Sequence, residues 1–166
     1  MILGPVVDWE KTVLATWRRS ASDEHYPNRD VWERLPEGVC WFEGQISADD
    51  ADRVYLIGSE DWEEVFGTYH LPEVSLPKSG VEDQCRHVQR IQRMRNALAE
   101  GWAPLPLVLV ATHHDGPYVV IDGNHRIVAL HQLTRLAAHR CYVGFHHKLA
   151  ADFVWYRRAV GTTPAK

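Results

Sequence analysis

The chain of 166 residues is long enough for one domain, or for one domain with a sizeable extension. Its 45% hydrophobic and 24% charged residues are typical of a globular protein, and its net charge of −4 argues against strong binding to nucleic acid, which needs a basic surface. No apolar run reaches the length of a membrane span and the three cysteines are widely separated, so we expect a cytoplasmic protein with reduced thiols and no membrane partner.

The first 67 residues contain short elements separated by turns. We expect a helix over residues 8–19, because Asp8 can cap it and an apolar stripe with a spacing of four begins at Trp9. The other expected elements are a strand at 39–44, a helix start at Ser47, a strand at 54–57 and a helix between Ser59 and Gly67.

The second half of the chain contains one clear amphipathic helix among apolar strands. We predict this helix over residues 88–100, because apolar residues recur three or four positions apart and Gly101 follows. The sequence His113-His114-Asp115-Gly116 between two apolar runs predicts a hairpin. The helix region carries four arginines, which we expect to be solvated unless one or two lean over a polyphosphate: Arg86, Arg90, Arg93 and Arg95. The remaining predictions are an edge strand at 71–77, strands at 105–111, 117–121 and 140–145, and a helix at 152–160.

The segment from Val119 to Leu130 is the most informative part of the sequence. An apolar run ends in Asp122-Gly123-Asn124 and a helical apolar pattern starts at once, which predicts a strand, a tight turn and a helix. A helix N-terminus offers unpaired N–H groups and a positive dipole end, and His125 and Arg126 add donors there, so a phosphate is the simplest occupant. The alternative is local: Asn124 caps the helix, Asp122 caps the turn, and the next two side chains are solvated.

The motif Asp122-Gly123-Asn124-His125-Arg126 resembles the Asp-Gly-His-His-Arg motif of small free-serine kinases in the ParB/sulfiredoxin-like superfamily. The similarity extends upstream through the predicted helix, the following strand and the hairpin, and covers roughly residues 69–145. Sulfiredoxins have a catalytic Cys where this chain has Asn124, and DNA-partitioning members have Gly-Glu-Arg-Arg in place of Gly-Asn-His-Arg. Neither of those activities is therefore expected.

The resemblance implies an α/β (α+β) fold with a small mixed sheet flanked by helices. The ParB/sulfiredoxin-like core would span residues 68–150, with an N-terminal α/β extension over 1–67 packed on it. Residues 151–166 would form a C-terminal helix and tail. The sequence leaves open whether the extension closes the pocket or makes a homodimer.

The resemblance also implies a nucleotide-dependent phosphotransferase, a kinase that acts on the hydroxyl of a small metabolite such as free serine. The donor would be ATP, ADP or another NTP, accompanied by Mg²⁺. The phosphates would be held by the turn and first helical residues, which are Gly123, Asn124, His125 and Arg126. The metal would be held by Asp122, a hard oxygen ligand.

The candidate catalytic residues are Glu82, Asp122 and His125; the resemblance implies that Glu82 takes the proton of the acceptor hydroxyl, with Asp83 in reserve. The alternative for Glu82 and Asp83 is an acidic first helical turn. Two other functions stay open: a nucleotide-binding sensor or nucleic-acid-associated module without chemistry, and a nucleotide hydrolase or nuclease that uses the same pocket. The chain has no Gly-x-x-x-x-Gly-Lys-Ser/Thr loop, which excludes a P-loop enzyme.

Overall fold

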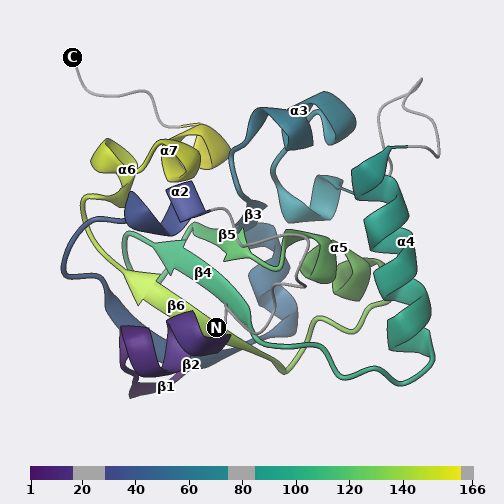
Figure 1. Cartoon of the computed structure of the whole chain (residues 1–166), viewed down its shortest axis with the longest axis horizontal. Helices are drawn as coiled ribbons and strands as arrows, with labels where there is room; N and C mark the ends of the chain where they lie inside the picture. Colours follow the sequence, from purple (N-terminus) through teal and green to yellow (C-terminus); the bar gives the residue numbers. More distant parts are fainter. Residues whose placement is uncertain (17–28, 75–84, 162–166) are drawn as a thin grey trace.

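The computed structural model describes residues 1–16, 29–74 and 85–161 (Figure 1). Within these residues, six strands form one mixed sheet in the order β1-β2-β6-β4-β5-β3, and helices flank it. The strands are β1 (Ile2–Val6), β2 (Cys40–Ile46), β3 (Val54–Leu56), β4 (Leu107–Ala111), β5 (Tyr118–Asp122) and β6 (His139–Phe145). The predicted mixed sheet flanked by helices is thereby confirmed.

Strand β4 lies inside the sheet, antiparallel to β5 and parallel to β6. All five of its residues are buried, which explains why its sequence is a continuous apolar run and not an alternating one. Strand β2 extends the sheet antiparallel to β6, and β3 lies parallel to β5 at the other edge. Residues 1–67 therefore supply strands at both edges of one continuous sheet, and the division of the chain at residue 67 stays a prediction.

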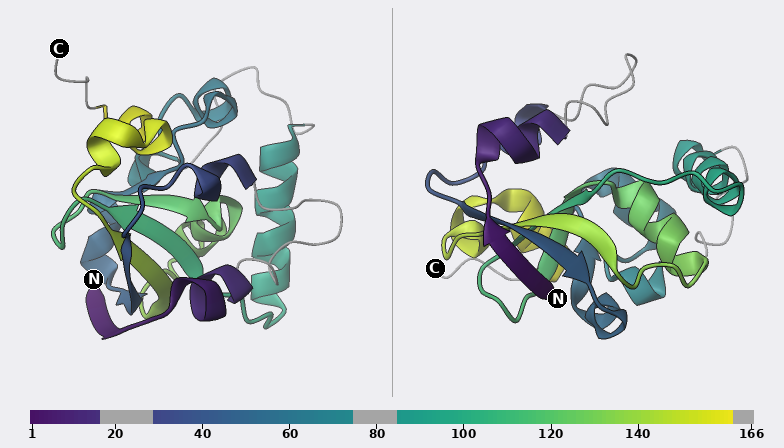
Figure 2. Two further views of the ribbon diagram at one scale, coloured as in Figure 1. Left: turned by 60° about the vertical axis from the view of Figure 1, so that its left-hand side comes forward. Right: turned by 90° about the horizontal axis from the view of Figure 1, so that it is seen from below.

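The described α-helices are α2 (Arg29–Glu33), α3 (Glu60–Phe66), α4 (Arg86–Ala99), α5 (Asn124–Gln132), α6 (Leu149–Asp152) and α7 (Val154–Val160). Helices α4 and α5 pack against each other on the right of Figure 1 and stay together in both views of Figure 2, whereas α6 and α7 lie at the upper left of Figure 1. The described residues also form one π-helical segment, η1 (Trp9–Leu14), and two 3₁₀ segments, η2 (Ala48–Arg53) and η3 (Leu71–Glu73).

Several predicted elements differ in detail from the observed ones. The helix expected over 8–19 begins as predicted at Asp8, whose carboxylate accepts the Lys11 N–H at 2.8 Å, but η1 has π-helical geometry; residues 17–19 lie outside the described part. The edge strand expected at 71–77 is wrong at residues 71–73, because Pro72 favours the first turn of the 3₁₀ segment η3. The helix expected at 152–160 is divided by Phe153, whose backbone is extended.

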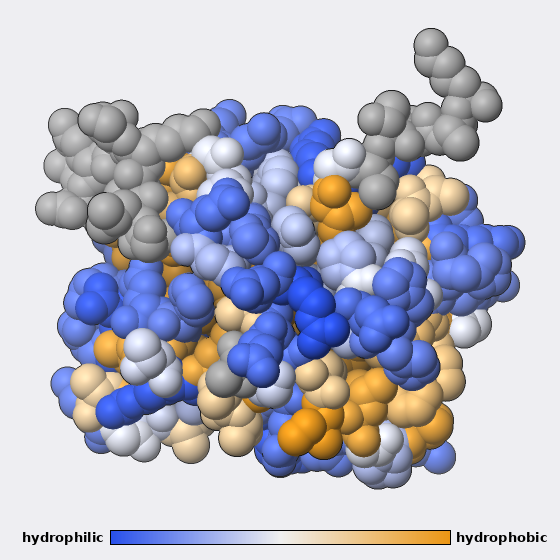
Figure 3. Space-filling model, turned by 180° about the vertical axis from the view of Figure 1, so that it is seen from behind, coloured by the Kyte–Doolittle hydropathy of each residue, from blue (hydrophilic) through white to orange (hydrophobic). Residues whose placement is uncertain are grey.

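Strand β1 was not predicted, because Gly4 and Pro5 weaken the strand signal in its sequence. Proline is tolerated there because β1 is an edge strand, and its pairing with β2 is irregular between Leu3 and Val6. Two of its side chains, Ile2 and Val6, are 64% and 65% exposed. Hydrophobic atoms gather at the lower right of Figure 3, on the side of the molecule where β1 lies.

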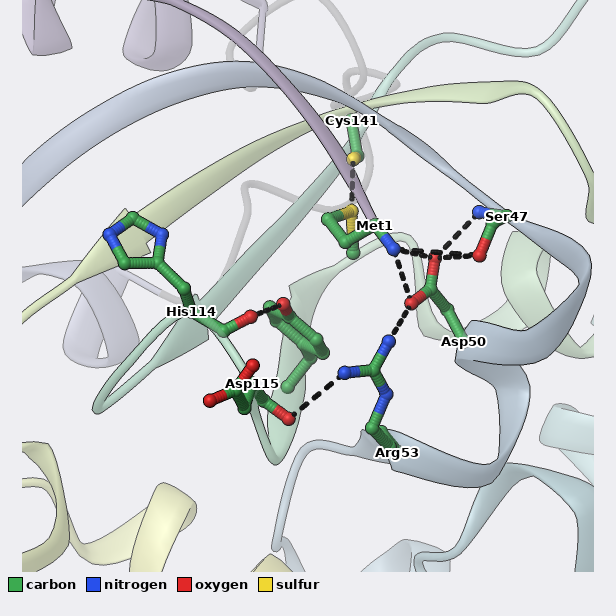
Figure 4. Close-up of polar contacts among 8 residues, drawn as sticks. Met1, Ser47, Asp50, Arg53, His114, Asp115 and Cys141 are labelled. Carbon is green, nitrogen blue, oxygen red and sulfur yellow. Dashed lines mark hydrogen bonds and ion pairs between the residues drawn. The ribbon is translucent and has the colours of Figure 1, made fainter.

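A buried carboxylate joins the start of β1 to η2 (Figure 4). Asp50 accepts the N–H and the hydroxyl of Ser47, each at 2.6 Å, and pairs with Arg53 and with the α-amino group of Met1. Burial opposes ionisation of Asp50, but the hydrogen bonds from Met1 and Ser47 outweigh it and hold its pKa below the ordinary value. The predicted helix start at Ser47 is therefore confirmed as a capping box. None of the helices in the described ranges is long and apolar enough to cross a membrane.

Candidate functional site

The turn between β5 and α5 has the predicted strand, turn and helix geometry. Gly123 has φ of 93°, and its carbonyl accepts the Ile127 N–H at 2.9 Å as the N-cap of α5. A Cβ at this position would lie 2.5 Å from the Leu107 side chain and 2.8 Å from the Arg126 guanidinium. Both the positive φ and the close approach require glycine here.

Asn124 is the first residue of α5 and holds the helix to the end of β3. The residue is 9% exposed, and its Oδ1 accepts the Ile57 N–H at 2.9 Å. The N-cap is Gly123, so Asn124 does not have the local capping role that the sequence allowed as an alternative. Its amide oxygen satisfies a buried backbone donor that would otherwise have no acceptor.

Arg126 and Asp122 form an ion pair one helical turn apart. The Nη2–Oδ2 distance is 2.7 Å, the two side chains are 7% and 20% exposed, and Nη2 also donates to the Pro106 carbonyl at 3.3 Å. The pair joins the end of β5 to α5 and to the residue that precedes β4. The predicted phosphate contact of Arg126 stays a prediction, and this geometry favours a structural role.

Magnesium at Asp122 also stays a prediction, and the donor set around this residue does not fit it. The Arg126 guanidinium already neutralises the carboxylate and occupies its Oδ2. Across the described residues, no group of three or more His, Cys, Asp and Glu side chains is arranged to hold a metal ion. We therefore assign no catalytic step to a metal.

His125 lies at the end of a hydrogen-bonded chain that includes two residues not singled out by the sequence. Its Nε2 is 2.8 Å from Nδ1 of His87, and Nε2 of His87 is 3.0 Å from Oδ2 of Asp61. We call Asp61, His87 and His125 the Asp–His–His chain. The three are the second residues of α3, α4 and α5, so the chain forms where three helices begin.

Trp62 covers the two imidazole rings of this chain. Its ring centroid lies 4.5 Å from that of His87 and 5.0 Å from that of His125, and the two imidazoles are stacked at 17°. Trp62 is 3% exposed and His87 6%, whereas the Asp61 side chain is 51% exposed. The chain therefore runs from a carboxylate at the surface to an imidazole covered by an apolar side chain.

The environment of the chain fixes the charge at both of its ends. Burial, reinforced by nearby His87, Arg90 and Arg86, lowers the pKa of His125 to about 3, with Asp61 opposing this shift. The hydrogen bond from His87 holds the pKa of Asp61 well below its ordinary range. At neutral pH, Asp61 is ionised and His125 is neutral.

Two arginines in the first turns of α4 act on His125. Arg86 is exposed and Arg90 is half-buried; burial, followed by the charges of Arg86 and Arg93, lowers the pKa of Arg90. No carboxylate within residues 1–16, 29–74 and 85–161 forms an ion pair with Arg86 or Arg90. Glu82 and Asp83, the predicted proton acceptor and its reserve, lie outside the described residues.

His87 was missed although the sequence carries a signal for it. His87, Ile91 and Leu98 share the inward stripe of α4, with spacings of four and seven, and all three are buried. A histidine on the apolar face of a helix whose first turn carries arginines points toward the interior. Asp61 had no such signal, because an acidic residue in a first helical turn is ordinary.

A comparison with known protein families, curated proteins and solved structures finds no match for this chain.

Proposed function

We propose that the protein is a nucleotide-dependent phosphotransferase with a hydroxyl acceptor, and that the phosphates bind where α4 and α5 begin. The observation that supports this most is the environment of His125. Two arginines without a carboxylate partner in the described residues act on a neutral imidazole at the start of two packed helices. Positive charge gathered around a neutral base suits an anionic substrate that loses or receives a phosphoryl group.

Two features of the first turns of α4 and α5 favour a bound anion. The His87–His125 contact joins side chains from the first turns of α4 and α5, and helix N-termini favour anions. The lowered pKa of Arg90 reflects burial and neighbouring like charges, a cost that a bound anion would remove. A phosphate placed against Arg86 and Arg90 would neutralise both.

A bound phosphate would also prepare His125 for catalysis. A negative charge within a few ångströms favours the protonated form of an imidazole, so phosphate binding raises the pKa of His125 from its low value in the free protein. The ring can then take the proton of a hydroxyl as its oxygen bonds to phosphorus and the bond to the nucleotide breaks. The similarity to free-serine kinases makes ATP or ADP the first donors to test and serine the first acceptor. Mg²⁺ would enter with the nucleotide, and the steps proposed here use only the protein's side chains.

Phosphorus NMR tests this function directly. Mixtures of the protein, Mg²⁺, ATP or ADP and a pool of hydroxylated amino acids should yield a phosphoester signal that is absent without protein. Arg86→Ala and Arg90→Ala should each weaken nucleotide binding by about tenfold, because each removes a charge-assisted contact. Arg95→Ala is the matched control, since Arg95 lies on the same helix but is not among the groups that act on Arg90 or His125. The proposal fails if no donor gives a phosphoester with any acceptor.

A second candidate function, nucleotide hydrolysis, is favoured by the same Asp–His–His chain, because a neutral imidazole linked to a carboxylate through a second imidazole can activate water as readily as an alcohol. Release of free phosphate without an added acceptor would identify it. Nucleotide binding in calorimetry with neither product would identify a sensor.

A further inference from the structure

The bonding of the Asp–His–His chain determines which nitrogen of His125 is available. An ionised Asp61 only accepts hydrogen bonds, so Nε2 of His87 must carry the hydrogen that it donates over 3.0 Å. In the tautomer of His87 that carries its only hydrogen on Nε2, Nδ1 is an acceptor, and the hydrogen in the 2.8 Å contact comes from Nε2 of His125. Nδ1 of His125 is then left with its lone pair.

We propose that Asp61 and His87 are positioning residues that act through His125, and that Nδ1 of His125 accepts the proton of the attacking hydroxyl. This inference rests on the proposed phosphotransferase function and names the proton acceptor of that reaction. It assigns to His125 the role that the sequence gave to Glu82.

The proton balance closes within the chain. As the acceptor oxygen bonds to phosphorus, its O–H bond breaks and an N–H bond forms at Nδ1 of His125. The hydrogen on Nε2 of His125 passes to Nδ1 of His87, and the phosphorus–oxygen bond to the nucleotide breaks with its electron pair on the leaving oxygen. His87 is then a cation beside the carboxylate of Asp61.

The relay has a physical purpose. A charged imidazole at His125 would be less well solvated than a free one, because the residue is partly buried and its ring lies against Trp62. Moving the charge to His87 places it 3.0 Å from a carboxylate that is 51% exposed. Ser59 and the Trp62 N–H hold the other oxygen of Asp61, at 2.5 and 3.1 Å, so the carboxylate is fixed in orientation. The arrangement resembles the way a buried aspartate orients a catalytic histidine in hydrolases.

The charged groups that act on His125 come from two neighbouring helices. They are Asp61 from α3 and Arg86, His87 and Arg90 from α4. The segment η3 also packs near α5, but the carboxylate of its Glu73 is hydrogen-bonded to Thr68 and His70. Among these described groups, Asp61 alone raises the pKa of His125, so its removal should move the acid limb of the rate profile to lower pH.

Asp61→Asn is the decisive variant, because Asp61 is half-exposed and Asn keeps its shape and one acceptor oxygen. The Asn amide can donate to Nε2 of His87, which reverses the chain and leaves His125 with its hydrogen on Nδ1. Imidazole nitrogen NMR of the full chain should show Nε2–H at His125 in the wild type and a shift toward Nδ1–H in Asp61→Asn. Glu64→Gln, an exposed carboxylate on the same helix, should change neither ring. The proposal is overturned if His125 of the wild type carries its hydrogen on Nδ1 alone. It is also overturned if Asp61→Asn has the same tautomers as the wild type.

Kinetics separates this inference from the proposed function. With an active wild type, Asp61→Asn should lower kcat by about 10²–10⁴-fold, with KM for the nucleotide unchanged and the acid limb shifted down. If the wild type is active and Asp61→Asn keeps the full kcat and the wild-type pH profile, the relay is refuted, whereas the proposed phosphotransferase function is not. If the wild type makes no phosphoester, the phosphotransferase fails and the nitrogen tautomers alone decide whether Asp61 and His87 orient His125.

Discussion

Asp122→Asn should destabilise the protein substantially, because it removes the counter-charge of a guanidinium that is almost completely buried. Asp122 and Arg126 are 2.7 Å apart, and the Arg126 side chain is only 7% exposed. Removing one partner of a buried ion pair costs about 3–5 kcal/mol, since the remaining charge keeps its desolvation penalty. Asp122 is 20% exposed and Pro106 still accepts one hydrogen bond from Arg126, so we expect a loss near the lower limit, about 3 kcal/mol.

Urea unfolding at neutral pH measures this loss, provided that the slope with denaturant is unchanged. The double variant Asp122→Asn with Arg126→Met removes both charges and should be clearly more stable than Asp122→Asn alone. Glu43→Gln is the matched control, because it breaks the Arg140–Glu43 ion pair, whose side chains are 60% and 37% exposed. That exposed pair should contribute less than about 1 kcal/mol.

A loss below about 1 kcal/mol in Asp122→Asn would refute the reasoning that the pair is structural. The same conclusion would follow if Arg126→Ala kept full stability but lost nucleotide affinity in calorimetry. Arg126 would then be the phosphate ligand that the sequence predicted, and the ion pair would be an arrangement of the free protein that the ligand replaces.

Three further predictions address pH, the proton acceptor and nucleic acid. His125 has a pKa of about 3 in the fold against an ordinary 6.5, so the unfolded chain binds more protons between these pH values and the free energy of unfolding should fall as the pH decreases through them. His125→Gln should reduce the dependence of the unfolding free energy on pH by up to about 1.4 kcal/mol per pH unit. The same pH dependence for wild type and variant in urea unfolding would contradict this. Glu82→Gln should lower turnover by about 10²–10⁴-fold if Glu82 is the base, whereas the relay through His125 predicts nearly full turnover in the phosphorus NMR assay. Duplex DNA should not bind strongly at physiological salt given the net charge of −4, and a mobility shift that collapses with added salt would show otherwise.

The sequence by itself determined the junction between β5 and α5, because the signals there are local. An apolar run, a glycine whose φ of 93° few other residues tolerate, and an immediate helical period together specify strand, turn and helix. The same holds for α4 and for the β4–β5 hairpin, whose predicted and observed bounds differ by one or two residues. Pairing between strands is not local, so the sequence did not reveal that residues 1–67 contribute edge strands of the same sheet.

Only the tertiary structure decided what the polar residues of the site contact. Asp122 and Arg126 were both assigned to a ligand from the sequence, but the turn at Gly123 directs their side chains toward each other. The Asp–His–His chain joins residues 26 and 38 positions apart, on three helices whose own patterns are ordinary. Hydrogen bonds of this kind depend on where packed helices place their first turns, and the periodicity of each helix specifies its buried face but not its neighbour.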